Sequence, residues 1–354
     1  MGEPIKEMEI IYNMLEDEQS RYIYRKRLNW LITRDYHYIG DILDRYSPNA
    51  RIYPNRTIEE IEKSIGNRQI IIYGAGGDAV FYISYLRKIN KDLVIGFCDR
   101  DAKLQTQGFY GYRVLSPLEL TLHMDAVIIV TPSRFNDEIR EYLEDIGFKS
   151  EQIIDGLFPL AECMSGMYFE QSIIHFEKEE IFVDGGAYDL STTLSLSALA
   201  KVKKAYAFEA DPNNIPKCNK TKEEYNMDFV QLYPFGLWNG SDTLSFGSEG
   251  NTKSGFYLDN KETKVEVKAL DEIVDPYDNI TFIKFDIEGS ELEALKGSKR
   301  TIMKYKPKLA ICIYHKPEDL YELPMYIKEL VPEYRLYLRH YYNRAHETVM
   351  YAVL

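Results

Sequence analysis

The spacing of hydrophobic and polar positions changes twice along the chain. Residues 1–66 have apolar residues at helical spacing and no strand-like alternation, so they predict a helical segment that caps the fold or contacts a second copy of the chain. Residues 67–156 and 157–354 each consist of short apolar runs that alternate with helical patterns. This alternation predicts an α/β protein with two Rossmann-like domains, each built on a parallel sheet, after the helical segment.

The second segment is predicted to have strands at residues 69–73, 93–98, 126–130 and 152–154, with helices at 80–87 and 136–146. Gly74, Gly76 and Gly77 follow its first strand, and Asp99 ends the second, 22 residues beyond Gly77. A carboxylate at roughly 20 residues from a glycine turn is placed to bind ribose hydroxyls. So short a glycine pattern is weak evidence by itself.

The third segment repeats this pattern on a larger scale. Its strands are predicted near residues 181–184, 204–209, 228–233, 280–286, 308–314, 333–339 and 347–353, with a helix at 318–330. The last two strands follow that helix with only a short connection between them. They therefore predict an antiparallel hairpin, with a reversed final strand, at the end of an otherwise parallel sheet.

Two strands of the third segment end in acidic residues. The apolar run before Asp286 leads directly to this residue and to Glu288, and the run at 181–183 leads to Asp184 and a glycine turn. Continuous apolar runs are typical of buried parallel strands, and open α/β sheets bind ligands at the carboxyl ends of their strands. The acidic residues therefore predict one active-site rim.

Glu209 ends the next strand, at the distance from the glycine turn that suits a ribose contact. The alternative is that Glu209 and Asp211 only cap the helix after Pro212. The glycines of the turn allow a ligand to approach the backbone, and Asp184 is placed to accept from a ligand ammonium group.

Composition narrows the classes of function. The 354 residues exceed the usual size of one core, so two domains are expected. The net charge of −13 argues against a nucleic-acid partner, and no apolar run is long enough to span a membrane. The four cysteines form no paired motif, which favours a reducing cytoplasm.

A parallel sheet closed by an antiparallel hairpin is the architecture of many methyltransferases that use S-adenosylmethionine. The third segment resembles the FkbM-type methyltransferases over roughly 180 residues. The matching motifs include Asp184-Gly185-Gly186-Ala187-Tyr188-Asp189, Phe208-Glu209-Ala210-Asp211-Pro212, Asp286-Ile287-Glu288-Gly289-Ser290-Glu291, Tyr314-His315-Lys316-Pro317, and Leu338-Arg339-His340-Tyr341.

This resemblance implies a class I fold, S-adenosylmethionine as the methyl donor, and O-methylation of a sugar or polyketide hydroxyl, as in polysaccharide biosynthesis. The residues expected to hold the cofactor are Asp184, Gly185, Gly186, Ala187, Tyr188, Thr192, Phe208, Glu209 and Asp286.

Members of the family usually have glycine where this chain has Leu190. If that position requires a positive φ, leucine adds roughly 1 kcal/mol of backbone strain. If the glycine only allows close packing, Leu190 narrows the cofactor site instead. A further alternative is that the domain is a degenerate, non-catalytic scaffold.

A sugar hydroxyl is a poor nucleophile near neutral pH, so a general base is expected. The candidates are His315, His340, Asp286 and Glu288. For His315, a pKa near the ordinary value of about 6.5 would leave the imidazole neutral. Asp286, Glu288 and a histidine could also bind a divalent cation, but no compact ligand spacing supports one, and no metal is predicted.

The second segment resembles small Rossmann-like domains found beside sugar-modifying enzymes, through Ile95-Gly96-Phe97-Cys98-Asp99 and Val114-Leu115-Ser116-Pro117. This resemblance implies that Gly74, Gly76, Gly77 and Asp99 bind a nucleotide-sugar. A purely structural domain and a nicotinamide-binding domain are the alternatives.

Taken together, these features and resemblances predict a cytoplasmic O-methyltransferase acting on a sugar hydroxyl of a glycan or a nucleotide-linked sugar.

Overall fold

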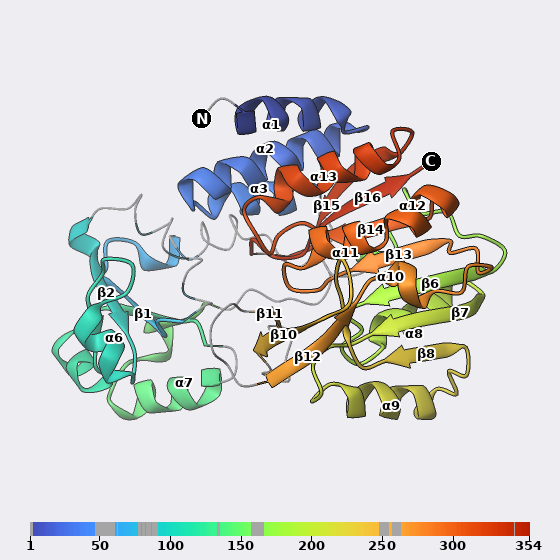
Figure 1. Ribbon diagram of the computed structural model, residues 1–354. Helices are drawn as coiled ribbons and strands as arrows, with labels where there is room; N and C mark the ends of the chain where they lie inside the picture. Colours follow the sequence, from blue (N-terminus) through green and yellow to red (C-terminus); the bar gives the residue numbers. More distant parts are fainter. Residues whose placement is uncertain are drawn as a thin grey trace. The chain divides into compact units, whose positions relative to one another are not determined.

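A computed structural model (Figure 1) describes residues 3–46, 61, 63–76, 79, 82, 86, 91–132, 135–156, 166–247, 255–256, 263–342 and 344–354. The chain divides into two compact units. The large unit contains Met1–Arg25, Ser165–Tyr341 and His346–Leu354, and the small unit contains Lys26–Met164 and Tyr342–Ala345. The predicted helical segment is thus shared between the two units, and the division falls within helix α2 (Glu18–Thr33).

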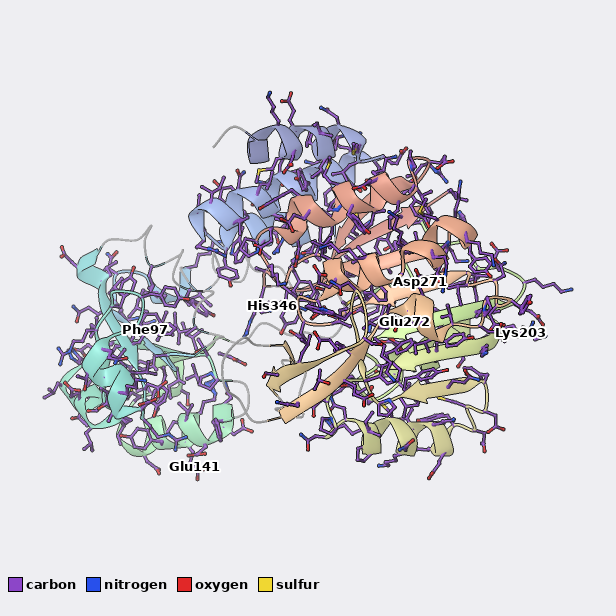
Figure 2. All side chains as sticks on the ribbon, in the orientation of Figure 1. Phe97, Glu141, Lys203, Asp271, Glu272 and His346 are labelled. Atoms are coloured by element: carbon purple, nitrogen blue, oxygen red, sulfur yellow. The ribbon has the colours of Figure 1, made fainter. Side chains whose placement is uncertain are left out.

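The small unit is built on a five-stranded parallel sheet with the order β3-β2-β1-β4-β5. Its strands are β1 (Ile70–Tyr73), β2 (Val94–Cys98), β3 (Val114–Leu115), β4 (Val127–Val130) and β5 (Ile153–Asp155). The central strands β1 and β4 are buried along their whole length, as their continuous apolar runs predict. Phe97 of β2 lies in the core on one side of this sheet (Figure 2).

The helices described in the small unit, beside part of α2, are α3 (His37–Tyr46), α6 (Ala102–Gln107) and α7 (Asn136–Asp145), with short 3-10 turns η1 (Lys91–Leu93), η2 (Pro117–Leu122) and η4 (Ser150–Gln152). The predicted helix at 80–87 lies outside the described residues except for Tyr82 and Leu86, which are both buried. Gly77 also lies outside them.

The large unit is built on a seven-stranded sheet with the order β15-β16-β14-β13-β6-β7-β8. Its strands are β6 (Glu180–Gly185), β7 (Val202–Phe208), β8 (Val230–Tyr233), β13 (Phe282–Phe285), β14 (Lys308–Cys312), β15 (Arg335–His340) and β16 (Thr348–Val353). Strand β16 lies between β14 and β15 and is antiparallel to both, whereas the other neighbours are parallel. The predicted reversed final strand and the predicted fold class are therefore confirmed.

The helices of this unit, after α1 (Glu3–Met14) and the start of α2, are α8 (Ser191–Leu199), α9 (Ile215–Glu224), α10 (Leu270–Ile273), α11 (Glu291–Gly297), α12 (Lys299–Tyr305) and α13 (Asp319–Leu330). Helix α8 packs on β6 and β7, while α11, α12 and α13 pack against one another (Figure 1).

A small second sheet in the large unit was not predicted. It has the order β11-β10-β12-β9 and consists of β9 (Gly236–Leu237), β10 (Asp242–Gly247), β11 (Gly255–Phe256) and β12 (Thr263–Lys268). Its two longer strands carry many polar residues, so they lack the continuous apolar runs that revealed the buried strands.

The amino-terminal residues cover the edge strand β15. The Leu338 backbone N–H donates to Ser20 Oγ at 2.8 Å, and the Glu16 N–H donates to the carbonyl of Leu336. Arg339 pairs with Asp17 at 2.7 Å. An edge strand with unpaired backbone groups is a site of unwanted association, so this part of the predicted cap has a clear structural role. Within the described residues, none of the helices is long and apolar enough to cross a membrane.

Candidate functional site

The order of the seven-stranded sheet reverses at β6. From β6 the chain adds β7 and β8 on one side, and it later adds β13 and β14 on the other. Ligands of open α/β sheets bind in the crevice at the carboxyl ends of the strands at such a reversal. Asp184 lies at the end of β6, while Glu209 and Asp286 directly follow β7 and β13. The structure therefore brings the three predicted acidic residues to one edge.

The glycine turn after β6 passes very close to the end of β13. Gly186 has a φ of +78°, and a Cβ added to it would lie 1.9 Å from the carbonyl oxygen of Asp286. A Cβ on Gly185 would lie 2.7 Å from the Phe285 ring. Only glycine allows both this conformation and this approach at position 186.

Asp184 is fully buried beneath this turn and has partners within the protein. Thr193 Oγ1 donates to it at 2.6 Å, and Lys284 Nζ lies 3.0 Å from its other oxygen. Lys284 also donates to the carbonyl oxygens of Gly185 and Gly186, at 3.2 and 2.8 Å. Burial lowers the pKa of Lys284, but the nearby carboxylates outweigh burial, so the pKa is raised and the lysine is charged. The structure therefore places Asp184 as the partner of Lys284.

Glu209 is nearly buried, and each of its oxygens accepts one backbone N–H. Tyr188 N donates to Oε2 and Asp211 N to Oε1, both at 2.7 Å. Burial raises the pKa of Glu209 against the lowering effect of these hydrogen bonds. The Asn214 side chain also hydrogen-bonds this carboxylate, whose two oxygens together have about four acceptor sites. The carboxylate thus fixes the turn and retains acceptor capacity towards a ligand.

The other residues expected at the cofactor lie along the same turn. The backbone N–H groups of Gly186 and Ala187 donate to the carbonyl of Phe208, at 3.0 and 2.9 Å. Tyr188, with a φ of +53°, and Thr192, in the first turn of α8, are both partly exposed.

Leu190 adopts the conformation that favours the usual glycine. Its φ is +66°, it lies directly before α8, and its side chain is fully buried in the core. The structure thus agrees with the alternative in which position 190 requires a positive φ. The strain of roughly 1–2 kcal/mol is offset by burial of the leucine side chain, which contributes about 1.5–3 kcal/mol.

Asp286 is the centre of a second set of contacts at this edge. Its carboxylate accepts from the Tyr168 hydroxyl at 2.7 Å and from the Tyr314 hydroxyl at 3.2 Å. His315 Nε2 lies 3.4 Å from its Oδ1. Burial raises the pKa of Asp286, but His315, Lys284 and the Tyr168 hydrogen bond outweigh it and the pKa is lowered. The carboxylate is therefore ionised.

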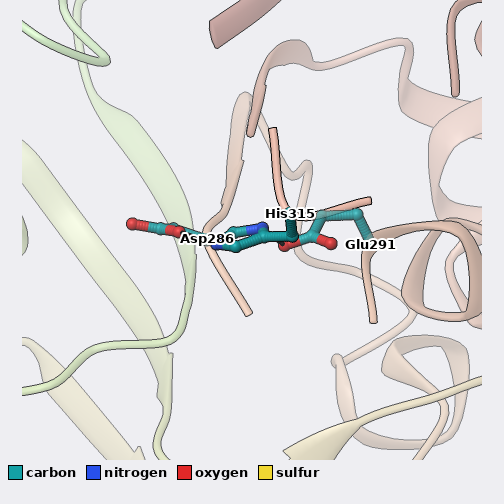
Figure 3. A group of neighbouring side chains, drawn as sticks. All are labelled: Asp286, Glu291 and His315. Carbon is teal, nitrogen blue, oxygen red and sulfur yellow. Dashed lines mark ion pairs between the residues drawn. The ribbon is translucent and has the colours of Figure 1, made fainter. Parts of the chain in front are cut away.

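His315, three residues after β14, lies among three carboxylates. Its Nε2 is 3.4 Å from Asp286 and 3.6 Å from Glu288, and its Nδ1 is 3.0 Å from Glu291. Figure 3 shows the imidazole between Asp286 and Glu291. Burial lowers the pKa of His315, but the carboxylates outweigh it and raise the pKa to about 10. The expectation of an ordinary, neutral histidine is therefore wrong for the ligand-free group, because acidic residues surround the ring.

Glu288 lies at the rim with a φ of +55°, an unusual conformation for a residue with a Cβ. Burial raises its pKa to about 7, with Asp286 and Glu291 adding to the effect of burial. Glu347, just before β16, and Asp319, at the start of α13, have pKa values raised to about 7, mainly by burial. Acidic residues thus exceed basic ones around His315.

His340 is not part of this group. It ends β15, and its Nδ1 lies 2.8 Å from the Thr348 hydroxyl of the neighbouring strand β16. The four predicted catalytic residues are therefore divided: Asp286, Glu288 and His315 lie together, and His340 pairs within the hairpin.

Several residues of the site were not predicted. They are Tyr168, Lys284, Glu291, Tyr314 and Glu347. Lys284 offered a signal, since a lysine inside a buried apolar strand requires a charged partner. Tyr168 offered none, because it reaches Asp286 from a loop 118 residues away in the sequence.

Among the described residues, Asp286, Glu291 and His315 could hold a metal ion, because their ligand atoms lie within 4.8 Å of one another.

The predicted ligand-binding residues of the small unit also adjoin one another. Asp99 Oδ2 accepts the backbone N–H of Ala75 at 2.8 Å, and its Oδ1 accepts that of Asp101 at 3.0 Å. Gly74 has a φ of +96°, and a Cβ there would lie 2.6 Å from Pro132, whereas Gly76 faces open space. Asp99 thus holds a glycine turn as Glu209 does in the large unit.

Comparison with known proteins agrees with this architecture. Residues 184–344 match the methyltransferase FkbM domain, and residues 66–154 match the C2185-like amino-terminal domain. The hexuronic acid methyltransferase AglP of Haloferax volcanii is 28% identical over 136 residues, which cover 36% of this chain and 56% of AglP. The match thus spans just over half the length of that relative.

A solved structure, that of methyltransferase FkbM from Methylobacillus flagellatus KT, has a similar fold. Its TM-score is 0.52 at 22% identity, over 90% of this chain and 98% of the other. At this identity the likeness concerns the fold alone. The family match, the strand order and the motifs on β6, β7 and β13 lead to one assignment. Residues 184–344 of this chain form a methyltransferase domain of the FkbM family.

Proposed function

We propose that the chain is an O-methyltransferase that uses S-adenosylmethionine and acts on a sugar hydroxyl of a glycan or a nucleotide-linked sugar. The observation that carries this proposal is the edge shared by β6, β7 and β13. There, a glycine turn and Glu209 adjoin the group formed by Asp286, Glu288 and His315.

The cofactor site fits this proposal. S-adenosylmethionine, when bound, supplies an activated methyl group on its sulfonium centre. Glu209 retains acceptor capacity for ribose hydroxyls, and the turn from Gly185 to Thr192 lets a ligand approach the backbone. Asp184 and Lys284 hold this turn from below, because together they fix both glycine carbonyls and the start of α8.

The acceptor requires a hydroxyl whose proton is removed. Asp286, ionised and held by two tyrosines, is placed to orient that hydroxyl, and His315 and Glu288 adjoin it at the rim. Positioning and proton removal together are the main requirements for transfer to a weak nucleophile. His340, which pairs with Thr348, is left with a structural role in the hairpin.

AglP is a hexuronic acid methyltransferase, and the similarity to it supports a sugar acceptor here. A hexuronic acid offers both hydroxyls and a carboxylate. A hydroxyl needs a base to remove its proton, whereas a carboxylate does not, and the carboxylates of Asp286 and Glu288 at the rim meet that need, so we infer transfer to a hydroxyl.

This inference predicts a methyl ether rather than a methyl ester. Incubation with isotope-labelled S-adenosylmethionine and a panel of nucleotide-sugars and uronic-acid glycans is expected to give a labelled sugar that resists mild alkali. Label that mild alkali releases as methanol would identify an ester, and the hydroxyl assignment would be wrong.

Substituting Glu209→Ala is expected to weaken binding of S-adenosylhomocysteine by about 1–3 kcal/mol, the range for hydrogen bonds to a charged group. Calorimetry on the folded variant measures this directly. Glu224→Ala, which removes an exposed acid from α9, is the matched control. An affinity unchanged in Glu209→Ala would remove this residue from the cofactor site.

For the small unit we propose binding of the nucleotide portion of the acceptor, supported by Asp99 and the turn at Gly74. Asp99→Ala is then expected to raise the KM for a nucleotide-linked acceptor several-fold without changing the affinity for S-adenosylhomocysteine. Equal KM values for the variant and the unsubstituted chain would contradict this role.

A further inference from the structure

The group around His315 has more carboxylates than cationic side chains. Three carboxylates, those of Asp286, Glu288 and Glu291, lie within 3.6 Å of one imidazole. The nearby Lys284 is already committed to Asp184 and two backbone carbonyls. Glu291 is fully buried, and a buried carboxylate is costly unless it is paired or coordinates a cation. Within the described residues, its ionic partner is the imidazole of His315.

Buried polar atoms in the same group have no hydrogen-bond partner. They are Oε2 of Glu291 and both ring nitrogens of His315. Glu291 is fully buried and the His315 side chain is 8% exposed, so water does not readily satisfy these atoms. The imidazole contacts are thus close ion pairs without aligned hydrogen bonds. Such unsatisfied groups are rare in native proteins, and a bound ion is one of the arrangements that satisfies them.

The spacing of the group matches that of ligands on one ion. The ligand atoms of Asp286, Glu291 and His315 all lie within 4.8 Å of one another. Divalent cations bind oxygen and nitrogen at roughly 2.0–2.6 Å, so two ligands on the same ion are at most about 4–5 Å apart. The separations of the three ligand atoms are therefore within the range that ligands of one ion span.

We propose that Asp286, Glu291 and His315 bind a divalent cation, with Glu288 at its edge. Two carboxylates and one imidazole form a mixed oxygen and nitrogen set that suits Mn²⁺, Mg²⁺ or Zn²⁺. Its function rests on the proposed methyl transfer: a cation beside Asp286 would hold the acceptor hydroxyl and lower its pKa. The binding itself does not depend on that reaction.

The test is a titration of the full chain, freed of metal with a chelator, with Mn²⁺ followed by calorimetry and by the electron paramagnetic resonance of free Mn²⁺. One site per chain is expected. Glu291→Gln and Asp286→Asn, both near-isosteric, are each expected to weaken binding at least ten-fold. Glu293→Gln, on the same helix but paired with Asn239 and Lys296 outside the group, is expected to leave binding unchanged.

Absence of Mn²⁺ binding, or equal binding by both near-isosteric variants, would overturn the proposal. Competition with Mg²⁺ and Zn²⁺ then ranks the ions. Binding of S-adenosylhomocysteine is measured on the same samples. Mn²⁺ binding without cofactor binding would support the metal site and contradict the proposed function. Cofactor binding without Mn²⁺ binding would contradict the metal site and leave the proposed function supported.

Discussion

Substituting Lys284→Met is expected to lower the free energy of unfolding by about 3–5 kcal/mol, the range for breaking a buried ion pair. The lysine and Asp184 side chains are 2% and 0% exposed, so water cannot replace the lost partner. The change leaves a buried carboxylate unpaired and removes a donor from the carbonyls of Gly185 and Gly186. Urea unfolding followed by circular dichroism measures the effect.

Lys203→Met is the matched control, since this lysine is exposed in β7 (Figure 2) and its substitution should cost less than about 0.5 kcal/mol. The double variant Lys284→Met with Asp184→Asn should recover part of the lost stability, because no buried charge remains. A loss below about 1 kcal/mol in Lys284→Met would show that the pair does not hold the turn.

Substituting His315→Ala is expected to reduce turnover by about 10²-fold, the cost of misplacing groups that orient the reactants. The reason is its position: the ring contacts Asp286 and Glu288 at the rim and lies outside the glycine turn. Affinity for S-adenosylhomocysteine should therefore be retained. Single-turnover methyl transfer and calorimetry on the same sample separate the two effects.

His340→Ala provides the internal comparison. Its hydrogen bond to Thr348 joins β15 and β16, so its loss is expected to lower stability with a smaller effect on turnover. His123→Ala, in the small unit, controls for histidine loss in general. A turnover more strongly reduced in His340→Ala than in His315→Ala would contradict the assignment of His315 to the site.

The strand ends were predictable because buried parallel strands produce unbroken apolar runs. The end of such a run located Asp184 and Asp286 to within a residue, and the short last connection located the reversed β16. The small sheet of β9 to β12 was not predicted, because its strands are short or polar and give no continuous apolar run.

The environment of the site could not be predicted in the same way. The pKa of His315 depends on three carboxylates whose distances follow from the turn between β13 and α11, and from the strained backbone of Glu288. No local pattern encodes these distances. Glu291 looks like an ordinary first residue of a helix, and only its burial against His315 gives it a chemical role.

Binding of S-adenosylhomocysteine to the full chain, measured by calorimetry, tests the central claim most directly. One site per chain is expected, with no heat of binding from nicotinamide cofactors under the same conditions. A folded chain that binds nucleotide-sugars but not S-adenosylhomocysteine would contradict the account. That result would favour the alternative of a non-catalytic scaffold, which was raised because Leu190 replaces the usual glycine.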